Sequence, residues 1–137
     1  MRAGRDRSLA GRLSVIAQKT LSDLSLKNCT VKIFLLSGKE MRDFEEKTGM
    51  RRANRHTPNV LSFSEPEGFP HPETEGKLIG EVYLNKDLAA RGFDGLAYLL
   101  IHGILHIMGY SHEEKNDILK MEALEQEICK KVLQDDK

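Results

Sequence analysis

Three histidines near the end of the chain are spaced so that their rings could surround one metal ion. His102 and His106 are one helical turn apart, so on a helix both side chains leave the same face. Gly109 can end that helix in a left-handed turn and direct His112 back toward the other two rings. Three imidazole nitrogens with a fourth position left for water are typical of a catalytic zinc site. The spacing therefore predicts one zinc ion bound by His102, His106, His112 and a water molecule.

The competing interpretation is that these three are core or surface histidines satisfied by hydrogen bonds. Apolar residues fill most of the positions around His102 and His106, which indicates a buried helix. Burying two imidazoles on an apolar helix carries a desolvation cost that a bound metal would offset, and this favours the metal. His56 and His71 lie outside the run, and we interpret each of them as a loop residue.

The spacing is that of the metzincin proteases, H-E-x-x-H-x-x-G-x-x-H, with one difference. Gly103 stands where the protease has its glutamate, which is the general base of peptide hydrolysis. A peptidase is therefore the weaker interpretation. The metal would still acidify its water and polarise an oxygen, and this chemistry suits a phosphodiester, which has a better leaving group and its own negative charge. We expect a metal-dependent hydrolase of phosphodiester bonds.

The length and composition indicate one soluble domain over residues 1–137. Cys29 and Cys129 are not part of a C-x-x-C pair, so we expect reduced packing residues of an intracellular protein, although a disulfide between them is an open alternative. We find neither a signal-peptide pattern nor an apolar run long enough to cross a membrane, which predicts a cytoplasmic protein without a membrane partner. The oligomeric state stays open.

The net charge is zero, but it is distributed unevenly along the chain. Residues 1–60 contain 13 Lys and Arg against 6 Asp and Glu, a net +7, and residues 61–137 contain 8 against 15, a net −7. A basic half can hold a polyanion through its phosphates, which is weak evidence for nucleic-acid binding by itself. Together with a metal site, it points to a nucleic acid as the substrate.

Hydrophobic periodicity and capping signals predict an α+β fold, a small mixed β-sheet packed with helices. Asp94 is the expected N-cap of the helix that carries the histidines, which is apolar nearly all round and therefore central and buried. After His112 a last amphipathic helix should turn its acidic residues outward. The zincin-like metal site would then lie at the end of the buried helix. The expected elements are a helix over 8–25 capped by Ser8, a strand over 29–36, a helix from the capping box Ser37–Glu40 to Gly49, strands over 59–64 and 77–84, a helix over 94–108, and the helix after His112.

Two long connections lie among these elements. Residues 50–58 form a basic loop that contains Arg51, Arg52 and Arg55. Residues 65–76 hold three of the four prolines and should form an irregular loop, and loops of that length are often functional. In the strand that follows, Gly80 either marks a bulge, which we favour, or permits close approach of a substrate.

With these features in place, the chain resembles the YbeY family, metal-dependent endoribonucleases specific for single strands that act in ribosomal RNA maturation. The segment His102-Gly-x-Leu-His106-x-x-Gly109-Tyr-x-His112 looks like the family's signature. The strand Val60-Leu-Ser-Phe63 looks like the one that follows the family's basic loop. The order and spacing of the elements between residues 28 and 130 also agree.

The resemblance implies a zinc ion on His102, His106 and His112, with these residues and a loop arginine as the catalytic set. The family's loop arginine, thought to contact RNA phosphate, aligns best with Arg52 counted back from Phe63, and Arg51 or Arg55 are alternatives because Ala53 and Thr57-Pro58 depart from the family's pattern. Ser111 stands where the family commonly has aspartate, and a serine orients a ligand or relays a proton more weakly than a carboxylate does.

The resemblance also implies the partners and the cellular role. They are single-stranded RNA, ribosomal RNA or ribosomal particles, with action in the maturation of the 3′ end of small-subunit ribosomal RNA and in ribosome quality control. The rival from another class is a ribosome-associated RNA-binding protein in which the metal only holds the fold together.

Overall fold

The computed structural model describes five segments of the chain, residues 8–26, 28–48, 59–64, 77–109 and 115–136. The predicted basic loop, the proline-containing loop and the segment around His112 lie outside these described residues. The elements in chain order are α1 (Leu9–Asp23), β1 (Cys29–Leu36), α2 (Gly38–Lys47), β2 (Val60–Ser64), β3 (Lys77–Asn85), the 3₁₀ helix η1 (Lys86–Arg91), α3 (Phe93–Ile107) and α4 (Lys115–Asp136).

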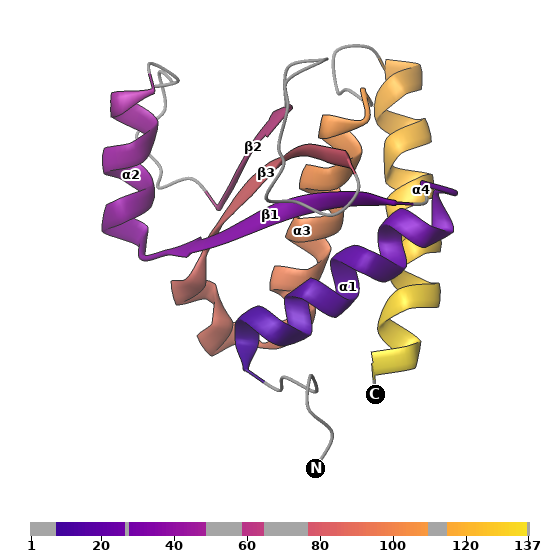
Figure 1. Ribbon diagram of the computed structural model, residues 1–137, viewed down its shortest axis with the longest axis horizontal. Coiled ribbons are helices and arrows are strands. Elements are labelled where there is room, and N and C mark those ends of the chain that lie inside the picture. Colours follow the sequence, from indigo (N-terminus) through magenta and orange to yellow (C-terminus); the bar gives the residue numbers. More distant parts are fainter. Residues whose placement is uncertain (1–7, 27, 49–58, 65–76, 110–114, 137) are drawn as a thin grey trace.

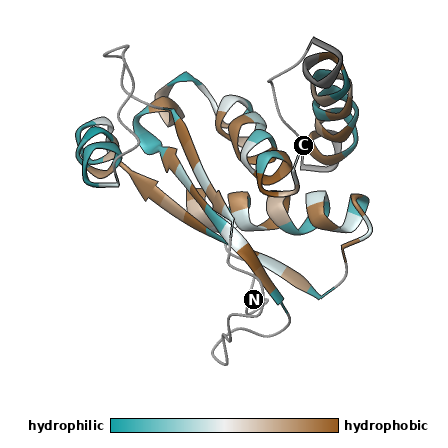
Figure 2. Cartoon of the chain, turned by 90° about the horizontal axis from the view of Figure 1, so that it is seen from above, coloured by the Kyte–Doolittle hydropathy of each residue, from teal (hydrophilic) through white to brown (hydrophobic). Residues whose placement is uncertain are grey.

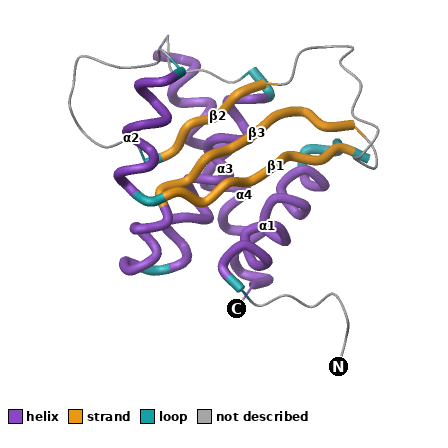
Figure 3. Tube along the Cα trace, turned by 60° about the vertical axis from the view of Figure 1, so that its left-hand side comes forward, coloured by secondary structure: helices purple, strands orange, loops and turns teal. Residues whose placement is uncertain are grey.

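The three strands form one mixed sheet in the order β1-β3-β2. β3 is central, pairing parallel with β1 and antiparallel with β2. Figures 2 and 3 show the layers: α1 and α3 lie on one face of the sheet, α4 lies on that same side beyond them, and α2 lies on the other face. The predicted α+β class with a small mixed sheet is confirmed.

The main core lies between the sheet and α3, and both α1 and α4 pack against that helix (Figure 1). α3 is apolar on nearly every face, as predicted, and seven of its residues are buried. Burying one large aliphatic side chain contributes about 1.5–3 kcal/mol, so this helix is a main source of the fold's stability. Fully buried side chains of the core include Leu13 and Ile16 of α1, Leu84 of β3, Leu100 and Ile104 of α3, and Met121 and Ile128 of α4.

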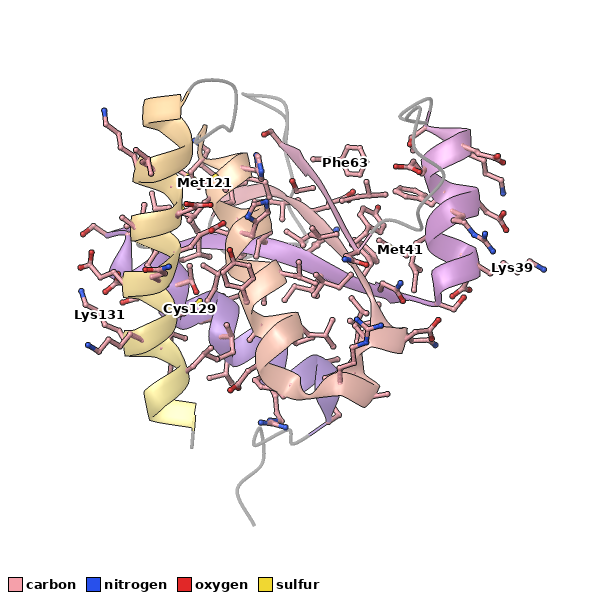
Figure 4. The ribbon with its side chains drawn as sticks, turned by 180° about the vertical axis from the view of Figure 1, so that it is seen from behind. Lys39, Met41, Phe63, Met121, Cys129 and Lys131 are labelled. Atoms are coloured by element: carbon pink, nitrogen blue, oxygen red, sulfur yellow. The ribbon has the colours of Figure 1, made fainter. Side chains whose placement is uncertain are left out.

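A smaller, aromatic cluster joins α2 to the opposite face of the sheet. The ring of Phe44 lies 4.3 Å from that of Tyr83 and 5.8 Å from that of Phe63, the latter in an edge-to-face arrangement. Phe34 stacks on Tyr83 at 4.7 Å, and Met41 is fully buried beneath α2. Figure 4 shows Met41 and Phe63 between α2 and the sheet, with Lys39 pointing away. The predicted inward positions of Met41 and Phe44 are confirmed.

Helix starts follow the predicted caps in two of three cases. The hydroxyl of Ser8 accepts a hydrogen bond from the backbone N–H of Gly11. Ser37 and Glu40 form the complete capping box, and these hydrogen bonds hold the pKa of the Glu40 carboxyl below its ordinary value. α1 ends at Asp23, two residues before the predicted end. α2 ends at Lys47, and Gly49, expected to mark its end, lies outside the described residues.

The predicted cap of α3 is wrong. Gly92 occupies the N-cap position with φ +119°, and Asp94 lies within the first turn, where its charge still favours the helix N-terminus. The cap differs because the 3₁₀ helix η1 connects β3 to α3 and ends directly before Gly92. Sequence periodicity did not reveal this short helix. A glycine is needed between these two helices because this left-handed backbone conformation strains other residues.

The bulge favoured at Gly80 is confirmed. Thr30 pairs with Leu78 and Val31 with Gly80, so Ile79 is the extra residue of β3. Gly80 also permits a close approach, but the approaching group is the backbone of β2 and not a substrate. A β-carbon at this position would overlap the carbonyl oxygen of Phe63.

Candidate metal centre

His102 and His106 come together near the C-terminal end of α3, as their spacing predicted. Both are partly buried, and their rings meet edge to face with centroids 4.6 Å apart. Their Nε2 atoms lie 3.1 Å from each other. The two imidazoles therefore present the same type of nitrogen to one point.

That separation fits a shared tetrahedral metal ion. Two imidazole nitrogens at roughly 2.0–2.1 Å from a tetrahedral zinc lie about 3.3 Å apart. The observed distance of 3.1 Å between the two Nε2 atoms is slightly shorter than this, and a small rotation of one ring removes the difference. The same distance is also that of an ordinary hydrogen bond between the two rings. The described residues thus supply two donors of the correct chemistry for zinc.

The third predicted ligand, His112, lies outside the described residues, as does Ser111. Among the residues that the structure does describe, no group of three or more His, Cys, Asp or Glu side chains is arranged to hold a metal ion. The three-histidine zinc site therefore stays a prediction.

Gly109 has the conformation predicted for it. Its φ is +101°, and its N–H donates to the carbonyl of His106 at 3.0 Å, directly after the helix ends at Ile107. The left-handed turn that was expected to redirect the chain toward His112 is present.

A buried carboxylate lies behind the histidine pair, and the sequence patterns had not predicted it. Glu125 of α4 is 1% exposed, and one of its carboxylate oxygens accepts a hydrogen bond from Nδ1 of His102. The prediction that α4 turns its acidic residues outward is therefore wrong for this one. The signal was available, because Glu125 lies four residues after Met121 and three before Ile128, on the apolar side of the helix.

Tyr98 binds the other oxygen of the same carboxylate. Its hydroxyl donates to Oε1 of Glu125 at 2.7 Å. Although 40% of Tyr98 is exposed, its hydroxyl lies against this buried group. Burial, the hydrogen bond and the negative charge of Glu125 raise the pKa of Tyr98 to about 12. The phenol therefore stays protonated and donates throughout the neutral range.

Cys129 is one turn further along α4 and is half-buried, with a free thiol as predicted. Figure 4 shows Met121 and Cys129 on the side of α4 that faces α3, and Lys131 on the side away from it. Burial, together with the charges of Glu125 and Asp94, raises the pKa of Cys129 to about 11. The thiol is therefore protonated at neutral pH and is a weak nucleophile.

Gly103, where the metzincins have their glutamate, faces the sheet. A β-carbon there would lie 3.1 Å from Cγ1 of Val82 and 3.4 Å from Cγ2 of Val60. The end of the same helix also meets the end of β2, where the hydroxyl of Ser64 donates to the carbonyl of Ile107 at 3.4 Å. Gly103 is thus part of the helix–sheet packing, and any side chain at this position would require Val82 and Val60 to shift.

The predicted phosphate-binding arginine, Arg52, and its alternatives Arg51 and Arg55 lie outside the described residues, as do His56 and His71. None of these assignments is tested by the structure. Among the described helices, none combines the length and the apolar character that crossing a membrane requires.

The fold and the site define a class: a small α+β protein with a histidine pair on its central helix and a buried carboxylate behind one ring. Comparison with known proteins identifies the group within that class. The sequence model of the family described as "Endoribonuclease YbeY" matches residues 5–133, so this chain belongs to the YbeY family. The resemblance drawn from the histidine signature is confirmed.

Curated relatives cover most of the chain. A protein named "Endoribonuclease YbeY" from Bartonella bacilliformis is 34% identical over 123 residues, which span 82% of this chain and 75% of the relative. A protein of the same name from Anaplasma marginale is 34% identical over 115 residues, which span 77% of this chain and 70% of the relative. Another, from Geobacter metallireducens, is 32% identical over 133 residues, which span 85% of this chain and 82% of the relative.

Proposed function

We propose that this protein is a metal-dependent endoribonuclease that cleaves single-stranded RNA, with ribosomal RNA and ribosomal particles as its partners. The more specific role proposed is maturation of the 3′ end of small-subunit ribosomal RNA and ribosome quality control in the cytoplasm. The observation that supports it most is the pair of facing Nε2 atoms on α3, in a chain whose family is described as endoribonuclease.

The proposed cofactor is one zinc ion, held by Nε2 of His102 and of His106 and by His112. When bound, zinc supplies a Lewis acid that polarises a phosphate oxygen and lowers the pKa of water. It suits this donor set because neutral imidazole nitrogens are common zinc ligands and the two described donors are spaced for it. The proposed domain is the whole chain, residues 1–137, organised around this site.

The chain's own residues would do the positioning. His102 and His106 project from a helix that is fixed in the core on several sides, so their nitrogens have little freedom to separate. Arg52 is proposed to hold the scissile phosphate, because its planar guanidinium can donate to two phosphate oxygens and offset the charge that develops on them. The end groups of the products distinguish the nucleophile, since attack by the RNA's own 2′-hydroxyl leaves a cyclic phosphate and attack by water does not.

The test is cleavage of a single-stranded RNA by purified wild-type protein with zinc, compared with His106→Ala and with the control His71→Ala, a histidine outside the signature. We expect loss of cleavage by at least about 100-fold in His106→Ala, unchanged cleavage in the control, and native circular dichroism for both. A His106→Ala protein that cleaves at the wild-type rate would overturn the proposal.

The same experiment separates the rival function. If His106→Ala and His112→Ala only lose their fold, and wild type binds RNA without cleaving it, the protein is an RNA-binding protein with a structural metal. Arg52→Ala, compared with Arg51→Ala and Arg55→Ala, identifies the phosphate-binding arginine as the one whose loss lowers cleavage most.

A further inference from the structure

The buried carboxylate of Glu125 requires an explanation because burial of an unpaired charge is costly. A carboxylate that is 1% exposed is retained only if its oxygens are hydrogen-bonded. Glu125 meets this condition fully: Oε1 accepts from Tyr98 and Oε2 accepts from His102. Both donors belong to α3, so the carboxylate is held between the two helices.

The two donors, Tyr98 and His102, are spaced so that each can bind one oxygen of the same carboxylate. Tyr98 and His102 are four residues apart on α3 and therefore lie on one face of that helix. Tyr98 donates at 2.7 Å and keeps its proton across the neutral range, so it fixes the oxygen that His102 does not use. The carboxyl group therefore cannot rotate away from His102 without breaking the bond to Tyr98.

The contact with Glu125 determines which nitrogen of His102 carries the proton. A carboxylate only accepts hydrogen bonds, so Nδ1 of His102 must be the donor. In a neutral imidazole the other nitrogen, Nε2, then carries no proton, and its lone pair is the one that can bind a metal. This is the nitrogen that faces Nε2 of His106 at 3.1 Å.

We propose that Glu125 is a positioning residue of the metal centre: by accepting the Nδ1 proton of His102, and held in place by Tyr98, it fixes the ring in the tautomer and orientation that direct Nε2 to the metal. Carboxylate partners of metal-binding histidines typically change metal affinity about 10–100-fold when they are removed. This inference rests on the proposed function, because it assumes that His102 is a metal ligand.

A purely structural role for Glu125, joining α4 to α3, makes a different prediction. In that case its loss lowers the melting temperature but leaves the proton on His102 where it was. The tautomer of His102 is therefore the decisive readout, and it is measured in metal-free protein by the ¹⁵N chemical shifts of the ring in two-bond ¹H–¹⁵N spectra.

The variants are Glu125→Gln, which removes the charge at nearly constant shape, and the control Glu127→Gln, an exposed glutamate that is 61% accessible on the same helix. We expect wild type and the control to have His102 protonated on Nδ1. Glu125→Gln should lose that preference and bind zinc about 10–100-fold more weakly in competition with a chelator. Tyr98→Phe should weaken zinc binding less.

Two results would overturn the inference. One is a wild-type His102 protonated on Nε2, a measurement that needs no variant and stands even if Glu125→Gln fails to fold. The other is a folded Glu125→Gln with wild-type tautomer and zinc affinity. Wild-type protein that binds no zinc would overturn the proposed function instead, whatever the tautomer of His102.

Discussion

Gly103 of α3 packs directly against Val82 of β3, and a β-carbon added to the glycine would lie only 3.1 Å from one methyl carbon of the valine. The glycine that replaces the metzincin glutamate therefore has a structural reason. A glutamate at this position would meet both Val82 and Val60 and would bring a charge into the core.

Gly103→Glu should accordingly fail to create a peptidase and should unfold the protein instead. Overpacking a core typically costs about 1–3 kcal/mol, and an unpaired buried charge adds to it. Urea denaturation followed by circular dichroism measures the loss, and a peptide substrate with zinc present measures peptidase activity. A stably folded Gly103→Glu protein that cleaves peptides would contradict this account.

Gly80→Ala should destabilise the fold by about 1–3 kcal/mol, because the added methyl group would overlap the carbonyl of Phe63 and lie 2.9 Å from Cδ1 of Ile107. The matched control is Gly95→Ala in the first turn of α3, where a β-carbon meets no atom within 4 Å. Alanine there should stabilise the helix by up to about 1 kcal/mol. Urea midpoints that move in the same direction for both variants would show that the close approach at Gly80 is not the cause.

Raising the pH above about 9 should weaken the fold. Burial and hydrogen bonds to carboxylates raise the pKa of Tyr83 and Tyr98 to about 12, and burial raises the pKa of Cys129 to about 11. In the unfolded chain these groups ionise nearer 10 for tyrosine and 9 for cysteine. Between the two values the unfolded state binds fewer protons, so the free energy of unfolding falls as pH rises.

Urea titrations at pH values from about 8 to about 11 measure this decline. We expect the fall to become shallower in Tyr98→Phe, which removes one of the three groups. A free energy of unfolding that stays constant over this range would contradict the raised pKa values of Tyr83, Tyr98 and Cys129 in the folded protein.

Cys129 should react slowly with alkylating reagents in the folded protein. A pKa near 11 instead of 9 lowers the thiolate fraction at a given neutral pH on the order of 100-fold. Glu125→Gln should speed the reaction, because the charge of Glu125 contributes to the raised pKa. Mass spectrometry of the peptide containing Cys129 gives the rate, with protein in urea as the unfolded reference. Equal rates in folded and unfolded protein would refute the prediction.

Local features of the site could be predicted because they depend on neighbours in the chain. The common face of His102 and His106 follows from helical spacing, and the turn at Gly109 follows from the backbone freedom of glycine. The capping box of Ser37 is local in the same sense.

Features that depend on distant contacts could not be predicted in the same way. Glu125 is 23 residues from His102 in the chain, and only the packing of α4 on α3 brings them together. The placement of α2 on the opposite face of the sheet and the helix η1 before Gly92 likewise depend on how the elements pack. Periodicity identified the apolar side of α4, but it could not predict that the carboxylate of Glu125 on that side would accept hydrogen bonds from two side chains of α3.

The most direct test of the central claim is a titration of metal-stripped protein with zinc while cleavage of a single-stranded RNA is followed. We expect cleavage to be absent without the ion and to rise until one zinc is bound per chain. We expect the His102→Ala and His106→Ala proteins, shown to be folded by circular dichroism, to recover no cleavage when zinc is added. Cleavage by metal-free wild type at the full rate, or full recovery in both variants, would contradict it.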